Sequence, residues 1–265
     1  MSARRRAIAA SAGSLASAAA LLASAPRAAL AQEPRDDVLY GKHHARESAQ
    51  RFAFELRFSP FTPDIDSDPA LNGATPYADA FGTTSRLLFA AELDWQAARI
   101  PHVGTIGPGV GLGYTTMSAN APFSQPHNGQ TVSSETTTLQ IFPLYAVAVL
   151  RADVLWRELH IPLVPYGKLG IGLAYWRASN TLGTSNYLGV SGLGHTLGTE
   201  LALGVGFNLN VLDEYAARNF DESLGVNSTY LFAEWTRSDL TGLWAQTDPL
   251  RVGGTFWTFG LTFEF

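Results

Sequence analysis

The feature that most constrains the fold of this chain is a regular alternation of large apolar residues with small or polar ones. In the first alternating run, Phe52, Phe54, Leu56 and Phe58 occupy every second position. Successive side chains of a β-strand point to opposite faces, so such a run predicts a strand with one apolar face. Eight runs of this kind occur, at residues 52–58, 87–95, 110–114, 139–149, 169–175, 201–209, 231–235 and 257–265. The chain is therefore expected to be all-β.

The composition indicates what the two faces of these strands contact. The face opposite the large apolar residues consists mainly of Gly, Ala, Thr and isolated charged residues. A water-exposed sheet would carry many lysines, but the chain has only Lys42 and Lys168, and 15% of its residues are charged against about 25% in typical soluble domains. The interior of an eight-stranded barrel is only just wide enough for side chains to fill it. We therefore expect the large apolar face to contact lipid and the small and charged face to fill the lumen.

Together these patterns predict an antiparallel up-and-down transmembrane β-barrel, all-β, with eight strands. Such barrels have long loops at one end and short turns at the other. The long loops are expected at residues 59–85, 118–136, 177–198 and 238–254. The short turns are expected at residues 98–104, 154–162 and 211–227, the last with a helical turn at 213–218.

Two further expectations concern single residues in the strands. Pro143 lies inside a predicted strand, and because proline lacks the N–H that a sheet needs, we expect a bulge or a strand displaced by one residue there. Aromatic residues near predicted strand ends are expected to form girdles at the membrane surfaces. These are Trp95, Tyr114, Trp176 and Trp235.

The N-terminus has the layout of a secretory signal peptide. Arg4, Arg5 and Arg6 precede an uncharged, Ala-rich stretch, and Ala29-Leu30-Ala31 fits a cleavage site. The predicted organisation is a signal peptide at 1–31, a flexible periplasmic segment at 32–50 and an outer-membrane β-barrel domain at 51–265. The alternative of a retained anchor helix is less favoured, because the stretch is diluted with Ala and Ser.

Charged residues on the small face are the candidate functional residues. They are Glu55, Arg57, Glu92, Asp94, Lys168, Glu200 and Glu234. Unpaired charges in a narrow lumen are costly, so we expect these side chains to pair in a network that fills the barrel. The alternative is a polar conduit or a small-ligand site in the same lumen.

Other chemistry finds little support in the sequence. Ser191, His195 and Glu200 lie close together and are considered as a nucleophile, base and acid, but spacing alone cannot give their geometry. Asp64, Asp66 and Asp68 have the odd-position spacing of a calcium loop, but the sixth position is Pro69 and the twelfth is Thr75, so the EF-hand pattern fails and a weak divalent site in this acidic loop is the alternative. The chain has no Cys. We assign no catalytic, cofactor-binding or metal-binding residue and expect no cofactor.

The C-terminal run resembles the β-signal of Gram-negative outer-membrane proteins, which the barrel assembly machinery reads. It comprises Trp257, Phe259, Leu261, Phe263 and the terminal Phe265. More widely, residues 51–265 resemble an outer-membrane β-barrel family of myxobacterial type. That resemblance is carried by FELRF (54–58), GATPY (73–77), ELDWQ (92–96), GLGYTTM (111–117), YAVAVLRAD (145–153) and IPLVPY (161–166). It implies location and fold but no activity.

The sequence thus predicts an outer-membrane barrel with a structural or surface-interaction role, not an enzyme. The expected partners are outer-membrane lipid and lipopolysaccharide, together with the barrel assembly machinery during biogenesis. The net charge of −5 does not suggest the basic surface that nucleic-acid binding requires, so nucleic acid is not an expected partner. The alternatives are a narrow pore or ligand-binding barrel, a lipid-modifying enzyme and a soluble exported barrel. The oligomeric state is open.

Overall fold

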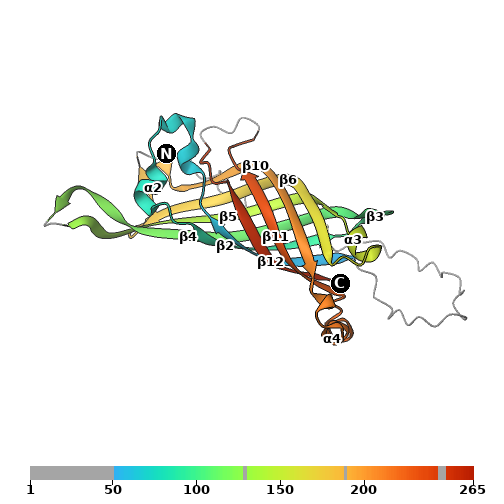
Figure 1. The fold of residues 1–265 in the computed structure, drawn as a ribbon. Helices are drawn as coiled ribbons and strands as arrows, with labels where there is room; N and C mark the ends of the chain where they lie inside the picture. Colours follow the sequence, from blue (N-terminus) through green and yellow to red (C-terminus); the bar gives the residue numbers. More distant parts are fainter. Residues whose placement is uncertain (1–50, 128–129, 188–189, 244–248) are drawn as a thin grey trace, which may run out of the picture. The chain divides into compact units, whose positions relative to one another are not determined.

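The chain folds into a closed antiparallel β-barrel in the computed structural model, which describes residues 51–127, 130–187, 190–243 and 249–265 (Figure 1). The predicted signal peptide and the segment 32–50 lie outside the described residues. The wall strands are β1 (Phe52–Phe61), β2 (Arg86–Trp95), β4 (Gly104–His127), β5 (Gln130–Arg151), β6 (Leu163–Asn180), β10 (Leu193–Asn208), β11 (Ser228–Asp239) and β12 (Gly254–Glu264). Consecutive wall strands pair with each other, and β12 pairs with β1, so the predicted eight-stranded barrel is confirmed.

The stagger of the barrel follows from its strand pairs. Starting at Glu55, the pairs through β2, β4, β5 and β6 lead to Gly198 of β10. The pairs in the other direction, through β12 and β11, lead to Asn208, ten residues away on the same strand. A closed barrel with this stagger requires strongly tilted strands, as is typical of small barrels.

The connections differ between the two ends of the barrel, as predicted. The described termini meet at one end, where the N–H of Phe52 donates to the carbonyl of Phe265 at 2.9 Å. That end also has the short elements β3 (Ala98–Ile100), α3 (Val154–Arg157), η3 (Leu209–Val211) and α4 (Glu214–Leu224), and α4 is longer than the helical turn expected there. The opposite end holds η1 (Ile65–Ser67), η2 (Pro69–Leu71), α2 (Pro76–Phe81), β7 (Gly183–Thr184), β8 (Asn186–Tyr187) and β9 (Val190–Ser191). Among the described residues, no helix is long and apolar enough to cross a membrane.

Two of the predicted long loops are largely strand instead. Strand β4 continues to His127 and strand β5 begins at Gln130. Most of residues 118–136 therefore form a hairpin that extends from the barrel (Figure 1). Likewise β6 continues to Asn180 and β10 begins at Leu193 within the predicted loop 177–198. The hairpin is rich in Thr, a β-branched residue that favours strands, and the hydroxyls of Ser118 and Thr138 hydrogen-bond across it at 2.9 Å.

The predicted orientation of the strands is confirmed for every wall strand except β5. In β5 the large residues Leu139, Ile141, Val147 and Val149 are buried, while Phe142, Leu144 and Leu150 are exposed. The reason is the glycine row of the neighbouring strand β4. A side chain at Gly111 would collide with the ring of Tyr145, and one at Gly109 would press against Val147 and Val149. Large residues on β5 therefore use the space that β4 leaves empty.

Two expectations about single residues are wrong. The register is unchanged around Pro143, because Leu112 pairs with Leu144 and Thr115 with Ile141 on either side of it, so neither a bulge nor a displaced strand occurs there. The missing N–H of Pro143 interrupts the backbone hydrogen bonds between β4 and β5 locally but does not shift the strand. Trp176 does not join the outer girdle, since it packs against the interior apolar cluster where the opposite residue, Gly194, leaves room for its ring.

Candidate functional site

A compact group of charged residues fills the middle of the lumen. Strand β1 supplies Glu55 and Arg57, and further members come from β2, β5, β6 and β11, so the group ties together distant parts of the wall. Each of these side chains is at least nine-tenths buried. The complete set is Glu55, Arg57, Glu92, Asp94, Arg151, Lys168 and Glu234. We call these seven residues the lumen network.

Two cations at the centre of the lumen network each contact three carboxylates. The guanidinium of Arg57 donates to Glu55 at 2.7 Å, to Glu92 at 2.9 Å and to Glu234. The Nζ of Lys168 lies 2.7 Å from Glu55, 2.6 Å from Glu92 and 3.4 Å from Glu234. Because every carboxylate here is shared by more than one cation, the buried charges compensate one another.

The third cation, Arg151, was not among the predicted site residues. Its Nη2 donates to Glu55 at 2.6 Å and to Asp94 at 2.5 Å. Arg151 shares the parity of Val147 and Val149, so assigning that face of β5 to the lumen would have placed it inside. The wrong orientation predicted for β5 therefore concealed a member of the lumen network.

Aromatic rings surround the cations of the lumen network. The hydroxyl of Tyr145 donates to Glu92 at 2.8 Å, and its ring lies 5.8 Å from the guanidinium carbon of Arg57. The ring of Tyr166 lies 5.1 Å from Lys168 Nζ and 5.4 Å from the guanidinium carbon of Arg151. These distances are within the range of cation–π attraction. The rings also occupy the space between the charged groups and the wall.

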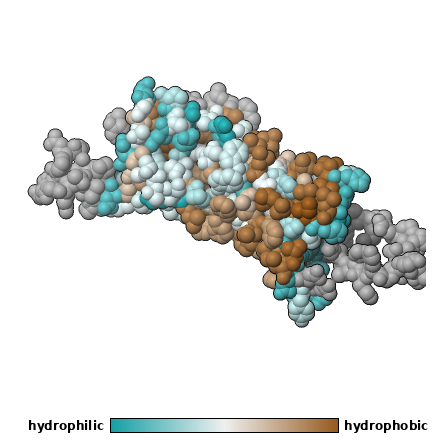
Figure 2. All heavy atoms as spheres, viewed as in Figure 1, coloured by the Kyte–Doolittle hydropathy of each residue, from teal (hydrophilic) through white to brown (hydrophobic). Residues whose placement is uncertain are grey.

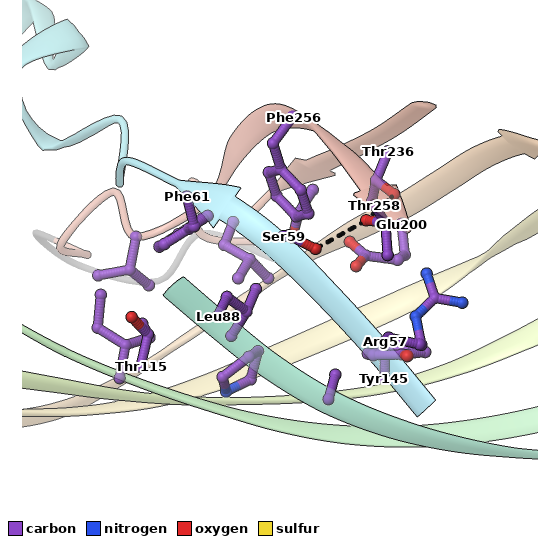
Figure 3. A pocket seen from close by; sticks show the side chains of 16 residues that line it. Arg57, Ser59, Phe61, Leu88, Thr115, Tyr145, Glu200, Thr236, Phe256 and Thr258 are labelled. Carbon is purple, nitrogen blue, oxygen red and sulfur yellow. Dashed lines mark hydrogen bonds between the residues drawn. The ribbon is translucent and has the colours of Figure 1, made fainter. Parts of the chain in front are cut away.

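A hydroxyl layer lies next to the network on the side of the long loops. Ser59 and Thr258 share a hydrogen bond of 2.9 Å, and Thr236 connects Thr258 to Glu234. Glu200 faces the same region and lines a cavity of about 30 Å³ with Arg57 (Figure 3), room for about one or two water molecules. Glu200 makes none of the ion pairs of the lumen network, and its Oε2 has no hydrogen-bond partner among the described residues.

An apolar layer closes the lumen beyond these hydroxyls. It combines inward residues of the strands with residues from the long connections, and it comprises Phe61, Ile65, Tyr77, Leu88, Met117, Leu139, Ile141, Ala174, Leu240 and Val252. The carboxylate of Asp66 holds α2 over this layer by accepting from the N–H groups of Tyr77 and Ala78 at 2.8 and 2.9 Å. Burial also raises the pKa of the Tyr77 phenol above its ordinary value. We call these ten residues the apolar plug.

The opposite end of the lumen carries a smaller polar group. Glu264 accepts from Gln96 Nε2 at 2.8 Å and from the hydroxyl of Tyr230 at 3.0 Å. Glu264 and Tyr230 are buried. Together with the lumen network and the apolar plug, this group makes the interior of the barrel a packed core.

The exterior of the barrel is apolar, the reverse of a water-soluble protein. Its most exposed residues include Val110, Leu112, Leu169 and Leu203, each more than half exposed. Figure 2 shows apolar residues gathered over the wall strands, with more hydrophilic residues toward the loops. Among the aromatic residues predicted for the girdles, Trp95 and Tyr114 are exposed on this surface. Large apolar patches outside and paired charges inside are the arrangement that a membrane-spanning barrel requires.

The other candidate sites are not assembled. His195 is exposed whereas Glu200 is buried, because the two side chains lie on opposite faces of β10. The acid therefore cannot orient the histidine, and the set of Ser191, His195 and Glu200 considered from the sequence does not form a triad. In the acidic loop, Asp66 caps α2 and Asp68 accepts from the N–H of Ala70 at 2.9 Å, so neither carboxylate is directed at a common cation.

Three carboxylates of the lumen network come close enough to bind a metal ion. They are Glu55, Glu92 and Asp94. Arg57, Arg151 and Lys168 already occupy the positions between these oxygens. The donor set therefore fits an internal salt-bridge network better than a metal site.

Comparison with protein-family models and with curated proteins finds no match. Similar solved structures include Ail of Yersinia pestis in complex with the heparin analogue sucrose octasulfate (12% identity, 82% of this chain, 97% of that chain, TM-score 0.38). OprG from Pseudomonas aeruginosa has 12% identity over 82% of this chain and 96% of that chain, with a TM-score of 0.42. The N-terminal β-barrel domain of Pseudomonas aeruginosa OprF has 9% identity over 82% and 98%, with a TM-score of 0.36. The closure of the present barrel follows from its own strand pairs.

Proposed function

We propose that this protein is an outer-membrane β-barrel with a structural or surface-interaction role and a lumen that conducts nothing. The observation that carries this proposal is that two layers of side chains, one charged and one apolar, close the lumen. The lumen network and the apolar plug follow one another along the barrel, and the cavity between them holds only about 30 Å³. A passage for solutes would need a continuous polar path, and the apolar plug interrupts it.

The location is supported by the surface and by the sequence. The apolar exterior suits lipid, and closed strand pairing satisfies the backbone within it. Trp257, Phe259 and Phe265 are exposed on β12 or at its end, where a β-signal would be accessible to the barrel assembly machinery. The signal-peptide pattern at 1–31 supports export, and the resemblance to barrels of myxobacterial type agrees with this location. We include lipopolysaccharide among the partners, at the end of the barrel with the long loops.

The second candidate, a narrow pore, is distinguished by conductance. Purified protein is refolded into vesicles, checked for the compact gel band that folded barrels keep in cold detergent, and then fused with a planar bilayer. We expect no current steps above the lipid baseline. Reproducible unitary currents that scale with the amount of compact protein would overturn the proposed closed lumen.

A further inference from the structure

The barrel wall carries two neighbouring hollows on its exterior along β5, β6 and β10, an apolar one and one that includes Arg177, and we call the two together the groove. Its apolar part, of about 450 Å³, includes Leu144, Ile171, Leu173 and Leu197. One step farther along the same strands, a second hollow of about 380 Å³ is lined by residues that include Phe142, Tyr175, Arg177, Leu193 and His195.

The two hollows are neighbours in the sheet. Leu144 pairs with Leu173, and Leu173 with Leu197. Two residues farther toward the long loops, Phe142 pairs with Tyr175, and Tyr175 with His195. The next residues on the same exterior faces are Arg177 and Leu193, which also pair. The two hollows thus follow one another along β5, β6 and β10, from the middle of the wall toward its loop end.

The cationic end of this groove has an unusual composition for a lipid-facing surface. Arg177 and His195 are both exposed on the exterior, and Arg177 makes no ion pair with another described residue. The rings of Tyr175 and His195 lie near each other, with centroids 6.1 Å apart. An arginine on the outside of a barrel is tolerated at the membrane surface but not in its centre. Arg177 therefore lies away from the centre of the membrane, on the side of the long loops.

Because the apolar hollow is followed by aromatic rings and then by Arg177, we infer a binding site for one phosphorylated glycolipid of the outer leaflet. Its acyl chain lies in the apolar part, along Leu144 and Ile171. Its phosphate is bound by Arg177, and its sugar lies against the aromatic rings of Phe142 and Tyr175. Guanidinium groups pair with phosphate through several hydrogen bonds, which gives the site its preference for an anionic headgroup. The inference rests on the proposed function, because it requires the long-loop end to face the outer leaflet.

The test uses protein refolded in phosphatidylcholine vesicles, with and without lipid A as the phosphorylated glycolipid. The readout is the temperature at which the compact gel band is lost. We expect diphosphorylated lipid A to raise this temperature by several degrees, and dephosphorylated lipid A to raise it much less. Arg177→Gln should abolish the difference between the two lipids. The matched control is Arg237→Gln, an exterior arginine of β11 that lies 3.7 Å from Asp239 and outside the groove, and it should keep the difference.

The outcomes separate this inference from the proposed function. If no vesicle yields a compact band, the membrane barrel itself is refuted, and the site with it. If the compact band forms but lipid A has no effect, or if Arg177→Gln and Arg237→Gln respond alike, the glycolipid site is refuted while the membrane barrel stands. A shift that depends on phosphate and on Arg177 supports the site.

Discussion

Lys168 and Glu92 are joined by an ion pair of 2.6 Å across the lumen, although two strands separate them around the wall. Lys168 lies on β6 and Glu92 on β2, so the pair directly connects two strands that backbone hydrogen bonds connect only through intervening strands, by the shorter way through β4 and β5. The lumen network therefore joins strands that are not neighbours in the sheet, and its ion pairs stabilise the barrel as a whole.

The first prediction concerns the removal of this cation. Lys168→Met keeps the length of the side chain but leaves Glu55 and Glu92 with fewer partners. Breaking a buried ion pair by removing one partner costs about 3–5 kcal/mol, so we expect the free energy of unfolding to fall by that amount. Urea titration of protein in vesicles, followed by tryptophan fluorescence, measures it.

Two matched variants make the Lys168 experiment specific. Arg237→Met removes a partner from an exposed pair and should change stability by only about 0–1 kcal/mol. Lys168→Met combined with Glu92→Gln removes both charges of the pair and should recover part of the loss. Equal effects of Lys168→Met and Arg237→Met would show that the lumen network does not stabilise the barrel.

The sequence predicts the number of strands and the inward charges of β1, β2 and β11, because their two faces differ clearly in character. It fails at β5, where both faces are apolar. The orientation of β5 depends on which of its two faces meets the glycines of β4, and in the structure it is the face of Tyr145, Val147 and Val149. That is a relation between two strands, so the pattern within one strand does not contain it. The same failure hid Arg151. The apolar plug was also missed, since Leu240 and Val252 come from a connection whose packing no periodicity encodes.

A second prediction tests this size matching between β4 and β5. Gly111→Ala places a methyl group against the ring of Tyr145, which hydrogen-bonds to Glu92. Overpacking of this kind costs about 1–3 kcal/mol, and the same urea titration detects it. Gly167→Ala is the control, because its methyl group would meet Leu203 only at an ordinary 3.4 Å.

Shortening the opposing side chain should rescue this variant. In Gly111→Ala combined with Tyr145→Leu, the two costs should be clearly less than additive, because the methyl group gains the space that the ring vacates. Strict additivity would mean that Gly111 and Tyr145 are not matched to each other.

A third prediction concerns the connection over the apolar plug. Asp66→Ala removes the acceptor for the N–H groups of Tyr77 and Ala78. Loss of a helix cap costs about 1 kcal/mol, so amide hydrogen exchange in α2 should accelerate about fivefold while the wall strands keep their protection. Asp79→Ala, which loses only a 3.3 Å contact with Thr75, should leave the exchange unchanged. Added Ca²⁺ should slow exchange in neither protein, and a calcium-dependent slowing that requires Asp66 would contradict its role as a cap.

The central claim, that the large apolar face of the barrel contacts lipid, is tested most directly by quenching of single labels. The chain has no Cys, so a fluorophore can be attached at Leu112→Cys, Leu169→Cys or Leu203→Cys on the wall, and at Leu182→Cys in an exposed connection. In vesicles, the three wall labels should be quenched by brominated phospholipid and shielded from aqueous iodide, and the label at position 182 should behave in the opposite way. Wall labels that iodide quenches and brominated lipid does not would contradict the account.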